Sequence, residues 1–181
     1  MRRLTTLFFL TLTAAAVPVA AQDNTFTLTS ADVKNGAFGP AQIFNGFGCT
    51  GKNVSPALSW KGAPSGTRSF VLTIYDPDAP TGSGFWHWVV MNIPASTTSI
   101  ATGASRTPKM PGVEMRTDFG TTGYGGPCPP AGDKPHRYIF SVYALKVDKL
   151  DLDPQATAAM VGFMTRANSL AVATFTARHG R

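Results

Sequence analysis

The sequence has few of the features that mark nucleic-acid-binding or membrane-spanning chains. Its 16 lysines and arginines exceed its 10 aspartates and glutamates, which gives a net charge of +6, but they form no basic run. Nucleic-acid surfaces typically cluster their positive charge, so a nucleic-acid partner is not expected. Beyond residues 1–21, no apolar stretch is long enough to cross a bilayer. We therefore predict no integral membrane span after that segment.

The first 21 residues have the pattern of a secretory signal peptide. Arg2 and Arg3 precede an uncharged apolar run, and small residues follow where a signal peptidase cleaves. We predict that residues 1–21 are removed and that residues 22–181 form one exported domain, periplasmic or secreted. An uncleaved anchor is the alternative. The remaining 160 residues, with a net charge of +4, are enough for a proper hydrophobic core.

Only two cysteines are present, Cys49 and Cys128, and both lie in loops rich in glycine and proline. An even pair in an exported protein predicts a disulfide. Closing a loop of about 80 residues would stabilise the fold by about 4 kcal/mol in the chain-entropy model. Two free thiols are the alternative. The paired cysteine spacing of a zinc site is missing, so no metal is expected.

Short segments between glycines and prolines have the character of strands. Residues 69–75, 87–93 and 137–145 are nearly all apolar or β-branched, as expected of central strands buried on both faces. Shorter strands are predicted at 26–30, 57–60 and 170–176. The chain has no internal repeat, and the fold class is a mainly β sandwich with a helix late in the chain.

That helix is predicted from Asp153, which would cap it, and Pro154, which suits a first turn. Apolar residues recur at helical spacing after them. We expect the stripe that contains Met160, Phe163 and Met164 to pack into the core.

The segment 75–88 joins two of the predicted central strands and carries two acids and a histidine. If these strands pair antiparallel, Asp76 and Asp78 lie near His87 at one edge of the sheet. Neighbouring prolines fix the backbone, and the aromatic residues supply apolar walls. Each residue alone also fits a structural role at a strand end or a turn.

The segment 125–138 leads into the third central strand. His136 and Tyr138 alternate with Arg137 and therefore share one face. Two imidazoles and a phenol, together with backbone amides of the glycine loops, would supply donors for an oxyanion. An aspartate, Asp76 or Asp78, would orient one imidazole. The third histidine, near the C-terminus, is expected to be solvated.

Three motifs resemble the phosphatidylethanolamine-binding proteins: 76–80 (DPDAP), 86–87 (WH) and 136–138 (HRY). The segments 53–56 (NVSP) and 118–120 (DFG) are similar to the bacterial YbhB/YbcL branch, also called Raf-kinase-inhibitor-like. The resemblance covers nearly all of residues 25–177. It implies a large central antiparallel sheet packed on a smaller sheet, with a C-terminal helix. It also implies a cavity that takes phosphate, acetate, cacodylate or phospho-headgroups in other members.

Transferred residue by residue, the resemblance implies a ligand-binding set from two regions. The first region supplies Asp76, Asp78 and His87, and the second supplies Pro129, Pro130, His136 and Tyr138. Cys128 stands where eukaryotic members commonly have glycine, and the C-terminal segment differs from theirs. Kinase inhibition is therefore not implied for this chain.

These observations predict a protein that binds a small anionic ligand (a phosphate, a carboxylate or a phospho-headgroup) without a cofactor and without catalysis. A hydrolase, or a metal enzyme that uses His87, His136 and Asp76, is the alternative. Ser83 lacks the pattern of a nucleophile elbow. A third hypothesis is an interaction protein whose loop 94–125 contacts a protein client, or a homodimer.

Overall fold

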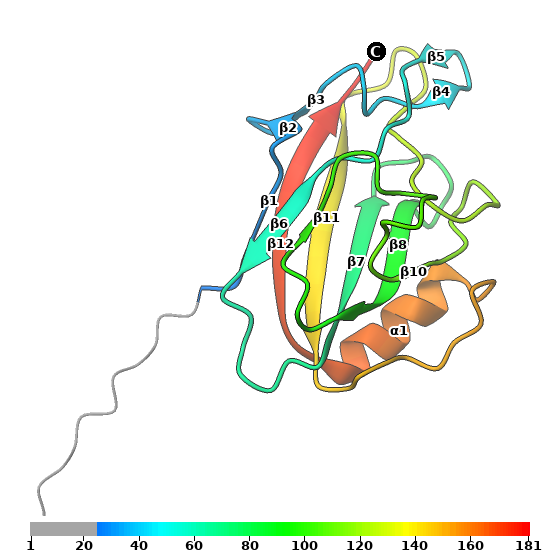
Figure 1. Cartoon of the computed structure of the whole chain (residues 1–181). Helices are drawn as coiled ribbons and strands as arrows, with labels where there is room; N and C mark the ends of the chain where they lie inside the picture. The colour runs from blue at the N-terminus through cyan, green and yellow to red at the C-terminus, as the bar shows by residue number, and fades with distance from the viewer. Residues whose placement is uncertain (1–24) are drawn as a thin grey trace, which may run out of the picture.

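Four long antiparallel strands, β7, β8, β11 and β12, form the centre of the computed structural model, which describes residues 25–181 (Figure 1). The predicted signal peptide, residues 1–21, lies outside the described residues. The large sheet has the order β10-β8-β7-β11-β12-β3-β2, in which β3 runs parallel to β12. A smaller sheet has the order β1-β6-β9, and β4 pairs with β5. The elements in chain order are β1 (Thr27–Thr29), β2 (Val33–Lys34), β3 (Ala37–Phe38), β4 (Asn45–Gly46), β5 (Cys49–Thr50), β6 (Leu58–Lys61), β7 (Ser69–Asp76), β8 (Phe85–Pro94), β9 (Ser99–Ile100), β10 (Val113–Glu114), β11 (His136–Leu145), α1 (Ala158–Asn168) and β12 (Ser169–His179).

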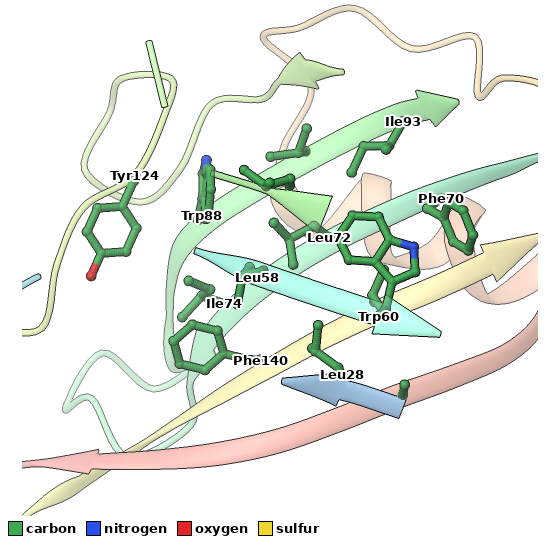
Figure 2. Packing of buried hydrophobic residues seen from close by; sticks show 14 of the residues in the cluster. Leu28, Leu58, Trp60, Phe70, Leu72, Ile74, Trp88, Ile93, Tyr124 and Phe140 are labelled. Carbon is green, nitrogen blue, oxygen red and sulfur yellow. The ribbon is translucent and has the colours of Figure 1, made fainter. Parts of the chain in front are cut away.

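The main core lies between the two sheets. Leu58 and Trp60, alternate residues of β6, point inward from the smaller sheet. They belong to the same buried cluster as Leu72 of β7 and Phe140 of β11 (Figure 2). This packing is the predicted sandwich, and each of the four long strands contains the range expected for it.

The opposite face of the large sheet carries α1. Val71, Val89 and Leu145, which alternate with residues of the main core, form a second buried cluster with Val161 of the helix. The central strands are buried on both faces for this reason, which explains why their sequences are apolar without alternation.

The predicted start of α1 is wrong. The helix begins at Ala158, and the Thr157 hydroxyl caps it by accepting a hydrogen bond from the Met160 amide. The Asp153 carboxylate instead accepts from the Gln155 amide at 2.7 Å, so it forms a separate turn upstream.

The predicted packing of the Met and Phe stripe is also wrong in part. Met160 is 48% exposed and Phe163 is 69% exposed, whereas Met164 is partly buried against the second cluster. The face of α1 that meets the sheet is made of smaller residues instead, namely Ala158, Val161 and Thr165.

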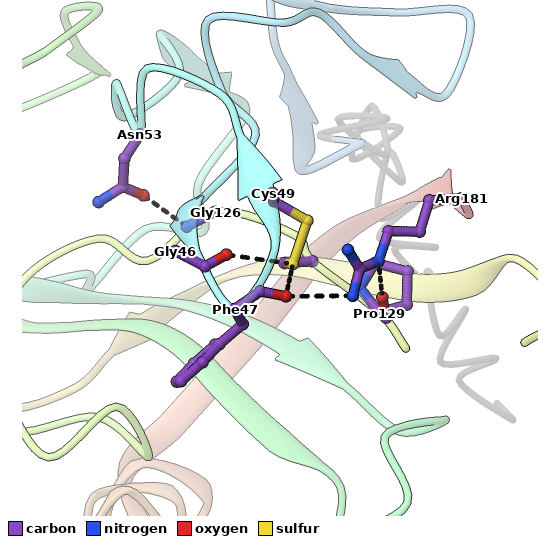
Figure 3. The surroundings of a disulfide bond; sticks show 8 residues. Gly46, Phe47, Cys49, Asn53, Gly126, Pro129 and Arg181 are labelled. Atoms are coloured by element: carbon purple, nitrogen blue, oxygen red, sulfur yellow. Dashed lines mark hydrogen bonds between the residues drawn. A yellow bond between two sulfur atoms is a disulfide. The ribbon is translucent and has the colours of Figure 1, made fainter. Parts of the chain in front are cut away.

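The predicted disulfide is confirmed. Cys49 of β5 is bonded to Cys128, 79 positions further along the sequence, with Cα atoms 6.0 Å apart (Figure 3). The bond joins the β4–β5 hairpin to the loop that precedes β11. Among the described helices, none is long and apolar enough to cross a membrane.

Candidate ligand-binding site

A cavity of about 150 Å³ lies at the end of the large sheet where β7 ends and where β8 and β11 begin. This is the same end of the molecule as the β4–β5 hairpin and the C-terminus (Figure 1). The lining brings together six of the seven residues that the sequence predicted for the site: Asp76, His87, Pro129, Pro130, His136 and Tyr138.

Asp76 and His136 form a buried pair in the cavity wall. The Asp76 carboxylate is 2.8 Å from the Nδ1 atom of His136, and both side chains are at most 5% exposed. The other carboxylate oxygen accepts hydrogen bonds from the amides of Asp78 and Ala79, at 2.8 and 3.2 Å. Asp76 therefore orients the His136 ring and closes the turn after β7 at the same time. The Nε2 atom of His136 faces the Asp133 carboxylate at 3.4 Å.

Asp78 is the predicted residue that the structure places outside the cavity lining. Its carboxylate accepts hydrogen bonds from the Arg137 guanidinium at 2.7 and 2.9 Å and from the Arg137 amide at 2.8 Å. Hydrogen bonds from Arg137 hold the pKa of Asp78 at about 2. Because Arg137 alternates with His136 and Tyr138 along β11, it lies on the other face of the strand and holds Asp78 there. Asp78 thus fixes the start of β11 from outside the cavity.

His87 of β8 is also buried in the cavity wall, with 5% of its surface exposed. Its Nδ1 atom lies 2.9 Å from the carbonyl oxygen of Gly125. A carbonyl only accepts hydrogen bonds, so Nδ1 carries a proton. Burial lowers the pKa of His87 below its ordinary value, against the opposing effects of the Gly125 carbonyl and the Asp76 charge. The ring contacts Tyr138 edge to face, with centroids 5.1 Å apart.

The hydroxyl group of Tyr138 is buried and has no hydrogen-bond partner within residues 25–181. Burial raises the pKa of Tyr138 far above its ordinary value, so the phenol keeps its proton as a donor. A buried hydroxyl without a partner costs about 1–3 kcal/mol. A ligand oxygen that accepted this hydrogen bond would remove that cost.

The predicted amide donors of the glycine loop are occupied by other groups. The Gly125 amide donates to the carbonyl of His87 at 2.9 Å, and the Gly126 amide donates to the Asn53 side chain at 2.7 Å. A Cβ atom on Gly126 would lie 2.1 Å from the Gln42 carbonyl oxygen, so glycine is required for this close packing. These amides hold the loop in place, and the cavity has fewer free donors than expected.

Aromatic rings form the outer walls of the cavity. The rings predicted for the site all lie in the segments 75–88 and 125–138. The structure adds Phe47 and Phe119, which line the cavity together with Phe85. Phe119 packs against Phe85, with centroids 4.8 Å apart. Phe47 is 73% exposed and has a positive φ of 51°, between two glycines. An aromatic residue between glycines in an irregular loop is the signal that would have indicated it.

His179, expected to be solvated, is partly buried. Its ring faces that of Phe38, with centroids 6.4 Å apart, and it is not among the residues that line the cavity.

The fold and the site define a β-sandwich with a small pocket at one end of its main sheet. The model of the family Phosphatidylethanolamine-binding protein matches residues 29–180. The chain belongs to this family.

Relatives confirm the predicted branch. YbcL of Escherichia coli is 49% identical over 167 residues, which cover 90% of this chain and 91% of YbcL. YbhB of the same organism is 51% identical over 154 residues, covering 83% of this chain and 97% of YbhB. The crystal structure of YbcL matches with a TM-score of 0.84 at 48% identity, over 86% of this chain and 98% of that chain. LppC of Mycobacterium tuberculosis, described by name as a lipoprotein, is 40% identical over 131 residues, covering 72% of this chain and 60% of LppC.

Proposed function

We propose that this protein is an exported binding protein that takes a small anionic ligand, such as phosphate, a carboxylate or a phospho-headgroup, into the cavity. The observation that carries the proposal is the buried Tyr138 hydroxyl, which has no partner in the described part of the chain and lies in a lining that also contains His87 and His136. Such a group is expected where a ligand completes the hydrogen bonding.

The size of the cavity supports a small ligand. Pockets for drug-sized molecules occupy roughly 300–1,000 Å³, whereas this cavity measures about 150 Å³. Phe47, Phe85 and Phe119 leave apolar surface at its walls. The arrangement fits one headgroup in the polar part, with a short apolar substituent toward the rings.

An exported location is supported by three observations. The N-terminal segment has the pattern of a signal peptide. A disulfide persists in oxidising compartments and is rare in the cytosol. The relative LppC is described as a lipoprotein. We therefore propose a periplasmic or secreted protein.

We propose that the cavity binds without catalysis. Its lining contains the Thr81 hydroxyl, which donates to the Gly84 carbonyl, and the sulfur of Cys128, which is in the disulfide. Neither is a free nucleophile. The described residues also hold no group of three or more metal-ligating side chains. A stoichiometric transition metal in protein purified without chelators would favour the enzyme alternative. The protein client and the homodimer stay predictions.

Calorimetry of the mature protein against phosphate and phosphoethanolamine tests the proposal. We expect binding of either ligand to weaken about tenfold in Tyr138→Phe, because one hydrogen bond to a charged ligand is lost. His87→Ala and His136→Ala should weaken it further, since each also removes part of the cavity wall.

Matched controls come from outside the cavity. Tyr143→Phe changes a tyrosine on the α1 face of β11, and His179→Ala changes the histidine that packs against Phe38. Both should bind as the unchanged protein does. If neither ligand binds, or if none of the three cavity substitutions changes the affinity, the proposal is wrong.

A further inference from the structure

The free nitrogen of His87 is an acceptor. Its Nδ1 atom must carry the proton, because it faces the Gly125 carbonyl at 2.9 Å. In the neutral ring, Nε2 then carries a lone pair. Within the described residues, the hydrogen bond at Nδ1 is the one that this ring makes, and His87 lines the cavity. A ligand atom that meets Nε2 therefore has to donate a hydrogen bond.

Asp76 adds a second acceptor to the same lining. Its carboxylate accepts three hydrogen bonds, from the amides of Asp78 and Ala79 and from His136, and it has about four acceptor positions. About one acceptor position of the Asp76 carboxylate therefore stays free. The negative charge of the carboxylate repels an ionised ligand oxygen at that position.

Positive charge to offset these acceptors is scarce. None of the described residues that line the cavity is a lysine or an arginine. The Gly125 and Gly126 amides are already bonded within the protein. The ring nitrogens of His136 face the carboxylates of Asp76 and Asp133, at 2.8 and 3.4 Å. Among the side chains of the described lining, the Tyr138 hydroxyl is the buried donor without a partner.

We infer that the cavity selects oxyanions that still carry a proton, such as hydrogen phosphate or the monoanion of a phosphate monoester, over fully ionised anions of the same shape, such as sulfate. The P–O–H group of the ligand donates to His87 or Asp76, and an ionised oxygen accepts from Tyr138. This inference rests on the proposed function, because it specifies the ligand of the same cavity.

A fully ionised anion has one other way to bind. His87 would have to take up a proton from solvent, so that Nε2 becomes a donor. The titratable groups around this ring are Asp76 at the end of β7, Asp118 in the loop between β10 and β11, and His136 and Tyr138 of β11. Burial opposes the charged ring, and the two carboxylates favour it. By either route, binding of a fully ionised ligand takes up one proton, which ends either on the ligand or on His87.

Calorimetry with phosphate, sulfate and methyl phosphate tests the inference. At about pH 7.5 we expect sulfate to bind at least about tenfold more weakly than phosphate, which keeps a proton at this pH. Methyl phosphate, with a second pKa near 6 as in other phosphate monoesters, should lose about tenfold in affinity for each pH unit above about 6.5. Titration in buffers of different ionisation enthalpy should show about one proton taken up per methyl phosphate bound.

A substitution adds a second measurement. Glutamine at position 87 offers both a donor and an acceptor, so His87→Gln should narrow the ratio of phosphate to sulfate affinity. His179→Gln should leave the ratio unchanged. Thermal unfolding checks that both variants are folded.

The outcomes separate the two proposals. If phosphate and methyl phosphate do not bind at all, the proposed function fails and the inference fails with it. If phosphate binds while sulfate binds within about twofold of it, and methyl phosphate shows no pH dependence and no proton uptake, the binding function stands and the inference is wrong.

Discussion

Two loops flank the polar residues of the cavity, and they are held in place by different kinds of interaction. Residues 77–84, between β7 and β8, are fixed by neighbours in sequence and, outside the cavity, by the pair that Asp78 forms with Arg137. The Asp76 carboxylate binds the amides of Asp78 and Ala79, and the Tyr75 hydroxyl donates to the carbonyl of Ser83. These contacts span at most eight residues.

Residues 125–135, before β11, are fixed by distant parts of the chain. Cys128 is bonded to Cys49, and the Gly126 amide donates to Asn53. The guanidinium group of Arg181 donates to the carbonyls of Pro129 and Phe47, at 2.7 and 3.1 Å (Figure 3). This loop therefore depends on several distant segments, whereas the first loop has one distant partner, Arg137. The Asp76–His136 pair joins the two.

The largest effect is expected where the two loops meet. Asp76→Ala removes the acceptor for two turn amides and for His136, and it leaves these buried donors without partners. Breaking a buried pair in this way costs about 3–5 kcal/mol. Urea unfolding should show this loss, and Asp78→Ala, whose pair with Arg137 is partly exposed, should lose about 1 kcal/mol or less. Equal losses in the two variants would contradict the distinction.

Removal of the disulfide should affect the second loop and leave the first loop unchanged. Cys49→Ser/Cys128→Ser opens a loop of 79 residues, and we expect stability to fall by about 2–4 kcal/mol. Hydrogen exchange should become faster at residues 125–135 and stay unchanged at residues 77–84. Faster exchange in both loops would show that the first loop is not held locally.

The difference between the two loops also explains which residues of the site could be predicted from the sequence. Asp76, His87, His136 and Tyr138 were predicted to meet because antiparallel pairing and strand alternation determine which strand ends share an edge and a face. Phe119 and Asn53 reach the site from irregular segments, whose positions depend on tertiary packing rather than on a local period. Local rules predicted the first loop, and only the cysteine pair pointed to the anchoring of the second.

Local patterns also failed where two of them competed. Asp153 and Pro154 have the composition of a helix start, but Thr157 caps α1 instead. Met160 and Phe163 are apolar, yet the sheet accommodates the smaller side chains of Ala158 and Val161. Periodicity identified the helix, but it did not show which of its apolar faces meets the sheet.

The Arg181 contacts offer a smaller test of the second loop. Arg181→Ala removes two hydrogen bonds to carbonyls on either side of the disulfide. We expect about 1 kcal/mol lower stability and an affinity for phosphate that falls about threefold, because Phe47 and Pro129 line the cavity. Arg181→Lys keeps the charge without the planar fork and should restore only part of the loss. Full affinity in Arg181→Ala would show that the disulfide alone holds this side of the cavity.

The smallest effect concerns the outer contact between the loops. Hydrogen bonds from Arg137 lower the pKa of Asp78 from 3.8 to about 2. A carboxyl group whose pKa is lower in the folded state stabilises the fold above its unfolded pKa, and this contribution is lost as the pH falls through the folded pKa. Urea unfolding of the unchanged protein and of Asp78→Asn should therefore differ most above about pH 5 and converge toward about pH 2. Because the pair is partly exposed, salt should shrink the difference. A difference that stays constant over this range would mean that the pair does not couple folding to the charge of Asp78.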